Sequence, residues 1–161
     1  MLLMTTMLTL AFNIQPVKAA AAAVYILADG SVDPPTAPIQ RDGSTYTLTG
    51  NITTDYDGIW IERNNVILDG AGYTVQGSGV IGGPSGIYLK GRSNVTIRNL
   101  KINQFSLGIW ADTCSSVSIS GNTITTNLNY GIGIILSSNN KIENNTIANS
   151  TNGIYLFYSA R

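Results

Sequence analysis

Few acidic residues of this sequence could serve as a catalytic pair. Glu62 and Asp112 hold equivalent places in two similar segments, Gly58-Ile-Trp-Ile-Glu62 and Gly108-Ile-Trp-Ala-Asp112. If these segments are strands two rungs apart in one sheet, the carboxyl groups lie roughly 9–10 Å apart, and inverting glycosidases separate their acid and base by about 6.5–9.5 Å. Lys90 holds the same place between them, and its charge would keep both carboxylates ionised, against the needs of a general acid. A charge ladder is therefore the favoured interpretation, with catalysis as the alternative.

Large aromatic residues recur two positions before these charged ones. Aligned on neighbouring strands they would form one outward column, and their flat faces would suit the apolar faces of sugar rings. The alternative is that the rings only stack on one another and shield the sheet, gaining about 0.5–1 kcal/mol per cross-strand pair. Gly133 interrupts the column and would be either a notch for a ligand or a gap. The candidate ligand-binding residues are Trp60, Tyr88, Trp110 and Tyr155.

A repeat sets the positions of all these residues. Segments that open with Gly-Ile begin at residues 58, 86, 108, 131 and 153. A period of about 22 residues indicates a solenoid, in which each repeat buries its apolar face against its neighbours. Each repeat holds three short runs of alternating apolar and polar residues, and Gly or Asn at the corners supplies the left-handed backbone of a sharp turn. The predicted fold class is all-β, a right-handed single-stranded parallel β-helix of about four to five coils.

Three parts of the chain differ in character. Residues 1–23 are expected to be a signal peptide or an N-terminal anchor, because a short apolar run precedes small residues at Val17 and Ala19, although no basic residue precedes Lys18. Residues 24–57 are interpreted as a lead-in with capping strands, and residues 58–161 as the repeats. Arg161 falls one strand into a coil, so we expect further coils or domains of a longer protein downstream. The expected location is extracellular, cell-surface or periplasmic.

Composition narrows the classes of partner. Nine basic residues balance nine acidic ones, which leaves no electrostatic footprint for nucleic acid. Cys114 is the single cysteine and cannot form an intrachain disulfide. Polysaccharide or a cell-surface glycan is the expected partner.

The repeat also carries a family resemblance. The segments Gly-Ile-Tyr-Leu and Asn139-Asn-Lys-Ile-Glu-Asn-Asn-Thr-Ile147 resemble the parallel β-helix repeat of NosD-like periplasmic proteins and of the related carbohydrate-binding and sugar-hydrolase group. The lead-in, with Ile26-Leu-Ala-Asp-Gly-Ser-Val32 and Asp69-Gly-Ala-Gly-Tyr-Thr-Val75, is similar to secreted archaeal β-helix proteins. The resemblance covers nearly all of the chain after the signal segment. It implies the fold and leaves function open, because β-helices host lyases, hydrolases, adhesins and binding modules.

The sequence has few side chains that could bind a metal ion. The resemblance to NosD suggests copper handling, but the chain has no His and its three Met residues lie within the expected signal segment. Cys114 has no His to activate it as a nucleophile. Asp55-Tyr-Asp57 could hold calcium, although a solvated loop is the favoured interpretation. We therefore expect no metal and no cofactor, with calcium as the alternative.

The sequence favours an exported binding or display module over an enzyme. The alternative is a polysaccharide lyase or glycoside hydrolase, and a NosD-like metal-handling protein is disfavoured. A lyase would need clustered carboxylates for calcium and a polygalacturonase a trio of close aspartates, whereas the remaining acids are scattered. If the chain is exported, glycosylation could occur at four Asn-X-Ser/Thr sites, of which the first two are the better candidates: Asn51, Asn94, Asn144 and Asn149.

Overall fold

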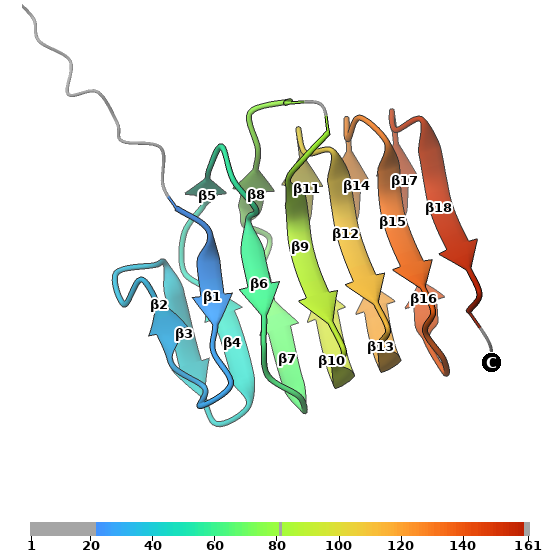
Figure 1. Cartoon of the computed structure of the whole chain (residues 1–161). Coiled ribbons are helices and arrows are strands. Elements are labelled where there is room, and N and C mark those ends of the chain that lie inside the picture. The colour runs from blue at the N-terminus through green and yellow to red at the C-terminus, as the bar shows by residue number, and fades with distance from the viewer. Residues whose placement is uncertain (1–21, 81, 160–161) are drawn as a thin grey trace, which may run out of the picture.

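The computed structural model describes residues 22–80 and 82–159, and these residues form a stack of strands with no helix among them (Figure 1). Residues 1–21 of the expected signal segment lie outside the described residues, as does Arg161. No helix of the described residues is long and apolar enough to cross a membrane.

Three sheets run along the stack, each built from one strand of every coil. Strands within a sheet pair in parallel, except for the antiparallel pairs β1–β2 and β3–β4 at one end. The third sheet has five strands, one per coil, which confirms the predicted β-helix of about four to five coils. The first sheet is β18 (Asn152–Phe157), β15 (Tyr130–Ile135), β12 (Leu107–Asp112), β9 (Ser85–Lys90), β6 (Ile59–Ile61), β1 (Val24–Ile26) and β2 (Val32–Asp33). The second is β16 (Lys141–Glu143), β13 (Ser115–Ser120), β10 (Ser93–Arg98), β7 (Val66–Asp69), β4 (Thr45–Leu48) and β3 (Ile39–Asp42). The third is β17 (Thr146–Ala148), β14 (Thr123–Thr125), β11 (Lys101–Asn103), β8 (Thr74–Gln76) and β5 (Ile52–Thr53).

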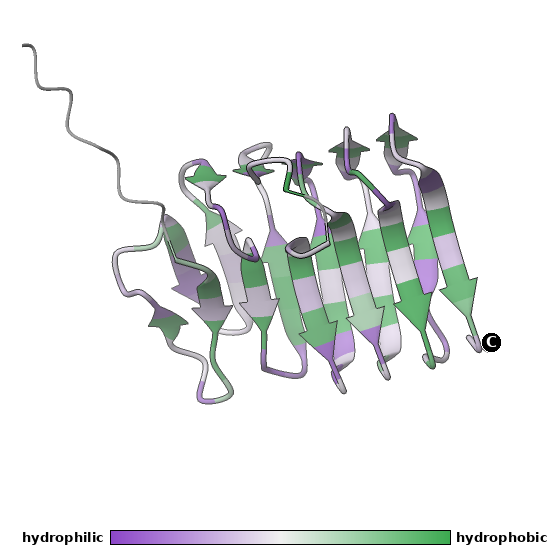
Figure 2. Cartoon of the chain, turned by 45° about the horizontal axis from the view of Figure 1, so that its top comes forward, coloured by the Kyte–Doolittle hydropathy of each residue, from purple (hydrophilic) through white to green (hydrophobic). Residues whose placement is uncertain are grey.

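Alternating side chains build the core. Along each strand of the first sheet apolar and polar residues alternate. The apolar positions of neighbouring strands lie side by side, and so do the polar positions (Figure 2). The register explains this alignment, because Ile59 faces Ile87 and Ile61 faces Leu89 on the next strand. Residues at these inward positions, such as Ile87, Leu89 and Ile109, have no exposed surface. The core is therefore a set of stacked columns, each contributed by the same position of every coil.

Close backbone contact explains why each repeat opens with glycine. A Cβ at Gly86 would overlap the carbonyl oxygen of Gly108 on the next coil and the side chain of Ile102. A Cβ at Gly108 would meet the carbonyl oxygen of Gly131 in the same way. These glycines allow neighbouring coils to approach at the corner, so any side chain there would push the coils apart.

Asparagine stabilises the corner between the second and third sheets. Asn122 is 1% exposed, and its Nδ2 donates to the Oδ1 of Asn145 at 3.0 Å on the next coil. Other corner residues have a left-handed backbone, including Asn99 at φ 56° and Asn144 at φ 54°. The predicted role of Asn in the sharp turns is thus confirmed, and Asn122 and Asn145 also join neighbouring coils through a hydrogen bond between their side chains.

Leu136 is an unfavourable residue at one such corner. Its φ is 49°, and the equivalent residue two coils earlier is Gly91 at φ 63°. Because branched side chains disfavour this conformation, we expect Leu136→Asn to raise the free energy of unfolding by about 0.5–1 kcal/mol in urea denaturation. Val80 has similar exposure, 55% against 56%, and its backbone φ is not positive. A gain in Val80→Asn as large as that in Leu136→Asn would contradict this explanation.

The lead-in contributes a coil of its own. Strands β1, β4 and β5 pair in parallel with β6, β7 and β8. The strands β2 and β3 then run antiparallel along the outer edges of β1 and β4 and cover part of that end of the stack. Residues 24–57, interpreted from the sequence as a lead-in with capping strands, thus include the three strands of a first coil.

Candidate functional site

The register places the predicted aromatic residues on neighbouring strands of the first sheet. Trp60 pairs with Tyr88, Tyr88 with Trp110, and Gly133 with both Trp110 and Tyr155. Tyr25 of β1 pairs with Trp60 and extends the row by one coil. Sequence reasoning missed Tyr25 because β1 lacks the Gly-Ile start, although Val24-Tyr-Ile26 has the same inward-outward alternation as Ile59-Trp-Ile61.

The contacts between rings divide the aromatic residues of this face into two groups. The N-terminal aromatic cluster consists of Tyr25, Trp60 and Tyr88, with centroid distances of 5.7 Å and 4.5 Å between successive rings. The C-terminal aromatic cluster consists of Trp110, Tyr130, Tyr155 and Phe157. In that cluster the ring planes of Trp110 and Tyr155 are within 8° of parallel. The single column expected from the sequence is therefore two clusters on one face.

Gly133 explains the direction in which Trp110 leans. A Cβ at Gly133 would overlap the six-membered ring of Trp110, so the ring covers the space that a side chain there would take. The notch for a ligand that the sequence allowed at Gly133 is filled by Trp110.

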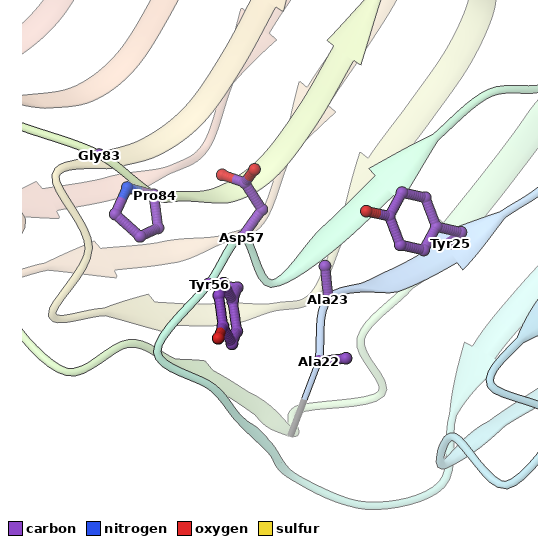
Figure 3. Close-up of a pocket in the computed structure, with 7 residues that line it drawn as sticks. All are labelled: Ala22, Ala23, Tyr25, Tyr56, Asp57, Gly83 and Pro84. Atoms are coloured by element: carbon purple, nitrogen blue, oxygen red, sulfur yellow. The ribbon is translucent and has the colours of Figure 1, made fainter. Parts of the chain in front are cut away.

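Two hollows border the N-terminal aromatic cluster. The first, about 540 Å³, lies beside Tyr25 (Figure 3), and the second, about 380 Å³, lies beside Trp60 and Tyr88. The loop between β8 and β9 supplies Gly83 and Pro84 to the first hollow. The remaining residues of the first are Ala22, Ala23, Tyr56 and Asp57, and those of the second are Ala28, Ile61, Glu62, Lys90 and Arg92.

Asp57 holds the cluster and the loop together. Its Oδ2 accepts a hydrogen bond from the Trp60 indole Nε1 at 2.7 Å, and its Oδ1 accepts one from the Ser85 backbone N at 2.5 Å. Both carboxylate oxygens therefore fix protein groups, which leaves Asp57 poorly placed as a calcium ligand. No group of three or more His, Cys, Asp or Glu residues suitable for a metal ion occurs within residues 22–80 and 82–159.

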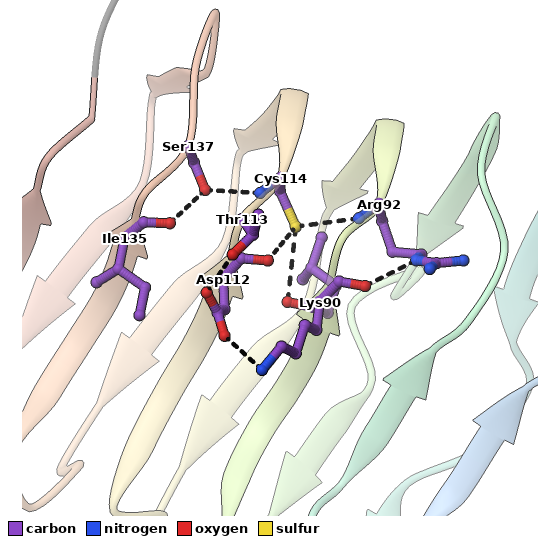
Figure 4. A network of polar contacts seen from close by, with 8 residues as sticks. Lys90, Arg92, Asp112, Thr113, Cys114, Ile135 and Ser137 are labelled. Atoms are coloured by element: carbon purple, nitrogen blue, oxygen red, sulfur yellow. Dashed lines mark hydrogen bonds and ion pairs between the residues drawn. The ribbon is translucent and has the colours of Figure 1, made fainter.

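Of the two candidate carboxylates, Asp112 is engaged by neighbouring side chains, Lys90 and Thr113 (Figure 4). Lys90 Nζ lies 3.2 Å from Asp112 Oδ2. A hydrogen bond from the Thr113 hydroxyl, opposed by partial burial and aided by Lys90, holds the pKa of Asp112 below its usual range. Asp112 is thus ionised at neutral pH and cannot serve as a general acid. Glu62 lines the second hollow, and Lys90 contacts Asp112 rather than bridging the two carboxylates.

Arg92 is a site residue that the sequence did not reveal. Its Nε donates to the Lys90 carbonyl at 2.8 Å, and its NH1 donates to the Glu62 carbonyl of the preceding coil at 2.7 Å. These contacts hold the guanidinium at the wall of the second hollow. Its position depends on the turn after β9, and no repeat pattern marks it.

The side chain of Cys114 is buried and contacts backbone carbonyl groups. It is 3% exposed, and its Sγ lies 3.2 Å from the Asp112 carbonyl oxygen. Burial raises the pKa of the thiol, which disfavours the thiolate. Cys114 is therefore a buried residue of the hydrophobic core.

The four predicted glycosylation sites, Asn51, Asn94, Asn144 and Asn149, are all exposed. The Nδ2 of Asn94 donates to Asn65 at 3.0 Å, so a glycan there would replace one corner contact. The use of any of these sites stays a prediction.

Comparison with known proteins completes this description. A search of curated proteins found no match. One solved structure is a crystal structure from Parabacteroides merdae ATCC 43184 described as a "putative glycosyl hydrolase", with 12% identity and a TM-score of 0.31 over 71% of this chain and 78% of that one. Residues 28–161 match the family described as "Periplasmic copper-binding protein (NosD)". Since this match spans most of the sequence, the chain belongs to the NosD family.

Proposed function

We propose that this chain is an exported β-helical module that binds carbohydrate at the N-terminal aromatic cluster. The observation that carries the proposal is the position of Tyr25, Trp60 and Tyr88 between two hollows. Sugar rings bind proteins through an apolar face laid on an aromatic ring, together with hydrogen bonds from the hydroxyl groups. The cluster offers the aromatic faces, and the hollows offer the polar groups.

The polar groups of the second hollow can both accept hydrogen bonds from sugar hydroxyl groups and donate hydrogen bonds to them. Glu62 offers acceptors, and Lys90 and Arg92 offer donors, all in the second hollow beside Trp60 and Tyr88. The C-terminal aromatic cluster is the weaker candidate because none of its residues lines either of the two hollows, whereas all three rings of the N-terminal aromatic cluster do. The ligand we propose is a polysaccharide or a glycan of a cell surface.

The proposed location follows from the family. The family is described as periplasmic, and the expected signal segment would direct the chain out of the cytoplasm. A module of this kind meets glycans of the envelope or its surroundings.

Hydrolysis of the glycan is the weaker alternative. The pKa of Asp112 is lowered, whereas a general acid needs a raised pKa. An ionised Asp112 could act only as the base beside Glu62, and its carboxylate is already engaged by Lys90 and by the Thr113 hydroxyl. Binding without turnover is the simpler function for this face.

The copper named in the family description does not fit this chain. Copper sites use His, Met or Cys ligands. The chain has no His, its Met residues fall within the first seven positions, outside the described residues, and its one Cys is buried. The donor set argues against a copper site formed by the described residues.

Removal of Trp60 tests the proposal. In a glycan array followed by calorimetric titration of the strongest ligand, we expect Trp60→Ala to weaken binding by about tenfold or more, because an aromatic anchor at the centre of a site dominates affinity. Trp60→Phe should retain most of the affinity because it keeps an aromatic face.

Trp110→Ala is the matched control. It removes the same side chain from the C-terminal aromatic cluster and should change affinity by less than about threefold. Equal losses in both variants, or an array without any bound glycan, would contradict the proposed site.

A further inference from the structure

Three arginines that form no ion pair gather at one corner of the stack. Within residues 22–80 and 82–159, three other basic residues are paired with a carboxylate: Lys90, Arg98 and Lys141. The arginines without such a partner in this part of the chain make up what we call the arginine row: Arg41, Arg63 and Arg92. An arginine whose charge has no counterion can bind an anion through its planar set of N–H donors.

Two guanidinium groups of the row converge on the turn after β1. Arg41 donates through NH1 to the Gly30 carbonyl at 2.9 Å and through Nε to the Gly43 carbonyl at 2.9 Å. A Cβ at Gly30 would overlap NH1 of Arg63 and would lie 2.6 Å from NH1 of Arg41. The two positive groups therefore lie side by side, although like charges repel one another. An anion bound by both groups would offset this repulsion.

Arg92 continues the row at the turn after β6. Its guanidinium points away from Asp112 (Figure 4) and donates to the carbonyl oxygens of Lys90 and Glu62. The turns after β1 and β6 are neighbours, because the Glu62 backbone N donates to the Ile26 carbonyl at 2.9 Å. Neutral carbonyl groups orient the Arg92 side chain but do not neutralise its charge.

The acidic side chains near the row do not pair with it. Asp29 interacts electrostatically with Arg41 and Arg63. Its Oδ1 accepts hydrogen bonds from the Ser31 backbone N at 2.8 Å and from the Ser31 hydroxyl at 2.7 Å. Asp42 pairs with Thr45 and projects from the face of β3 opposite to Arg41. No carboxylate of the described residues forms an ion pair with any arginine of the row, so the three guanidinium groups stay open to an outside anion.

We propose that the arginine row binds the acidic groups of a glycan, so that the ligand of the N-terminal aromatic cluster is a polysaccharide that carries carboxylate or sulfate groups. This inference rests on the proposed carbohydrate binding and names the class of sugar. The row lies beside the cluster, because Arg92 lines the second hollow with Trp60 and Tyr88. Ala28 of the same hollow belongs to the turn that contains Gly30. The planar guanidinium fork matches the oxygens of such acidic groups in pairs of charge-assisted hydrogen bonds.

The first hollow has the opposite character and would hold a neutral part of the ligand. Among the residues that line it, Asp57 alone is charged (Figure 3). The two hollows lie at opposite ends of the same strands, since Asp57 precedes β6 and Glu62 follows it. A glycan that lies along these strands over the rings therefore places its acidic unit at the arginine row, away from the Asp57 carboxylate.

Binding by the wild type tests the preference for acidic sugars. The probes are oligosaccharides of galacturonic, glucuronic and mannuronic acid and of sulfated galactose, each compared with its carboxyl-reduced or desulfated form by calorimetric titration. We expect the best acidic probe to bind at least about tenfold more tightly than its uncharged form at low salt, with a smaller advantage at high salt. Whether that probe is carboxylated or sulfated identifies the acidic group.

The contrary outcomes separate this inference from the proposed function. Uncharged forms that bind as tightly as the acidic ones would overturn the inference and leave carbohydrate binding in place. Binding to none of the probes in either form would contradict both. Equal binding of a single-stranded DNA oligonucleotide would show general attraction of polyanions and would also overturn the inference.

Two variants of the row test its residues, with the ratio of the two affinities as the readout. Arg92→Gln and Arg63→Gln should each reduce the advantage of the acidic probe to within about threefold. Arg63 donates no hydrogen bond within residues 22–80 and 82–159, so Arg63→Gln leaves the fold intact. The matched control Arg98→Gln removes the same charge from the second sheet, where Asp69 pairs with it, and should keep the full ratio. An unchanged ratio in both row variants, or an equal fall in Arg98→Gln, would overturn the inference.

Discussion

Phe105→Ala is expected to lower the free energy of unfolding by about 3–5 kcal/mol, as is typical when a buried ring is removed from a packed core. Phe105 is 1% exposed. Its ring lies beside two backbone glycines, since a Cβ built on Gly77 or Gly86 would be 2.8 Å or 3.1 Å from the ring carbons. Glycines have no side chain that could shift into the vacated space, so a cavity would remain.

Equilibrium unfolding in guanidinium chloride measures this loss. The midpoint should fall while the dependence on denaturant stays unchanged. Tyr56→Ala is the control, because Tyr56 is 60% exposed and its truncation should change stability by less than about 0.5 kcal/mol. A loss in Phe105→Ala below about 1.5 kcal/mol would mean that the coils collapse around the cavity.

Phe105 also illustrates what the sequence cannot predict about this fold. The strands of the repeats are predictable because inward and outward residues alternate and the period is constant. Phe105 follows Gln104, whose φ is 60°, in a turn without alternation. Its burial depends on the space beside Gly77 of the preceding coil and Gly86 at the start of its own coil, so only the stacked structure reveals it.

The sequence did not predict that the lead-in forms a first coil, for a similar reason. β1 and β4 belong to the same sheets as the repeats, but the residues between them form the antiparallel strands β2 and β3 and break the period. Pairing across 35 residues, as between Val24 and Ile59, leaves no local signal in the sequence. The sequence of residues 24–57 shows the alternation of strands, but it does not show that these strands belong to a coil of the stack.

For the candidate site, register was predictable and side-chain direction was not. Trp60, Tyr88 and Trp110 are aligned as the repeat requires. The direction of each ring depends on its neighbours: the Asp57 carboxylate binds the indole of Trp60, and the bare backbone of Gly133 lets Trp110 lie across it. Contacts of this kind join residues outside the aligned positions, so the division into two clusters emerges only in three dimensions.

Asn122→Ala is expected to lower the free energy of unfolding by about 3 kcal/mol, because it leaves buried backbone groups without partners. The Oδ1 of Asn122 accepts a hydrogen bond from the Leu100 backbone N at 3.0 Å. Its Nδ2 donates to the carbonyl of Ile97 on one side and to Asn145 on the other. Alanine replaces none of these bonds, and water cannot reach a residue that is 1% exposed.

Asn94→Gly is the matched control at an exposed corner. Asn94 has a φ of 54° and one amide bond to Asn65, and glycine adopts the same backbone, so stability should change by less than about 0.5 kcal/mol. Comparable losses in both variants would show that corner Asn residues act through the turn rather than through buried hydrogen bonds.

Asn122→Asp keeps the shape of the side chain at position 122 but removes its hydrogen-bond donor. The introduced carboxylate keeps the acceptor for Leu100 but sets its other oxygen against the carbonyl of Ile97 and the Oδ1 of Asn145, to which the Nδ2 of Asn122 donates in the wild type. Burial and these acceptors should raise the pKa of the introduced carboxyl group in the folded state. Its proton is then held more tightly by the folded chain than by the unfolded chain, so stability relative to the wild type should fall as the pH rises from about 4 to about 7. Urea denaturation at the two pH values measures this difference, and a pH-independent loss would contradict a buried, hydrogen-bonded amide at this corner.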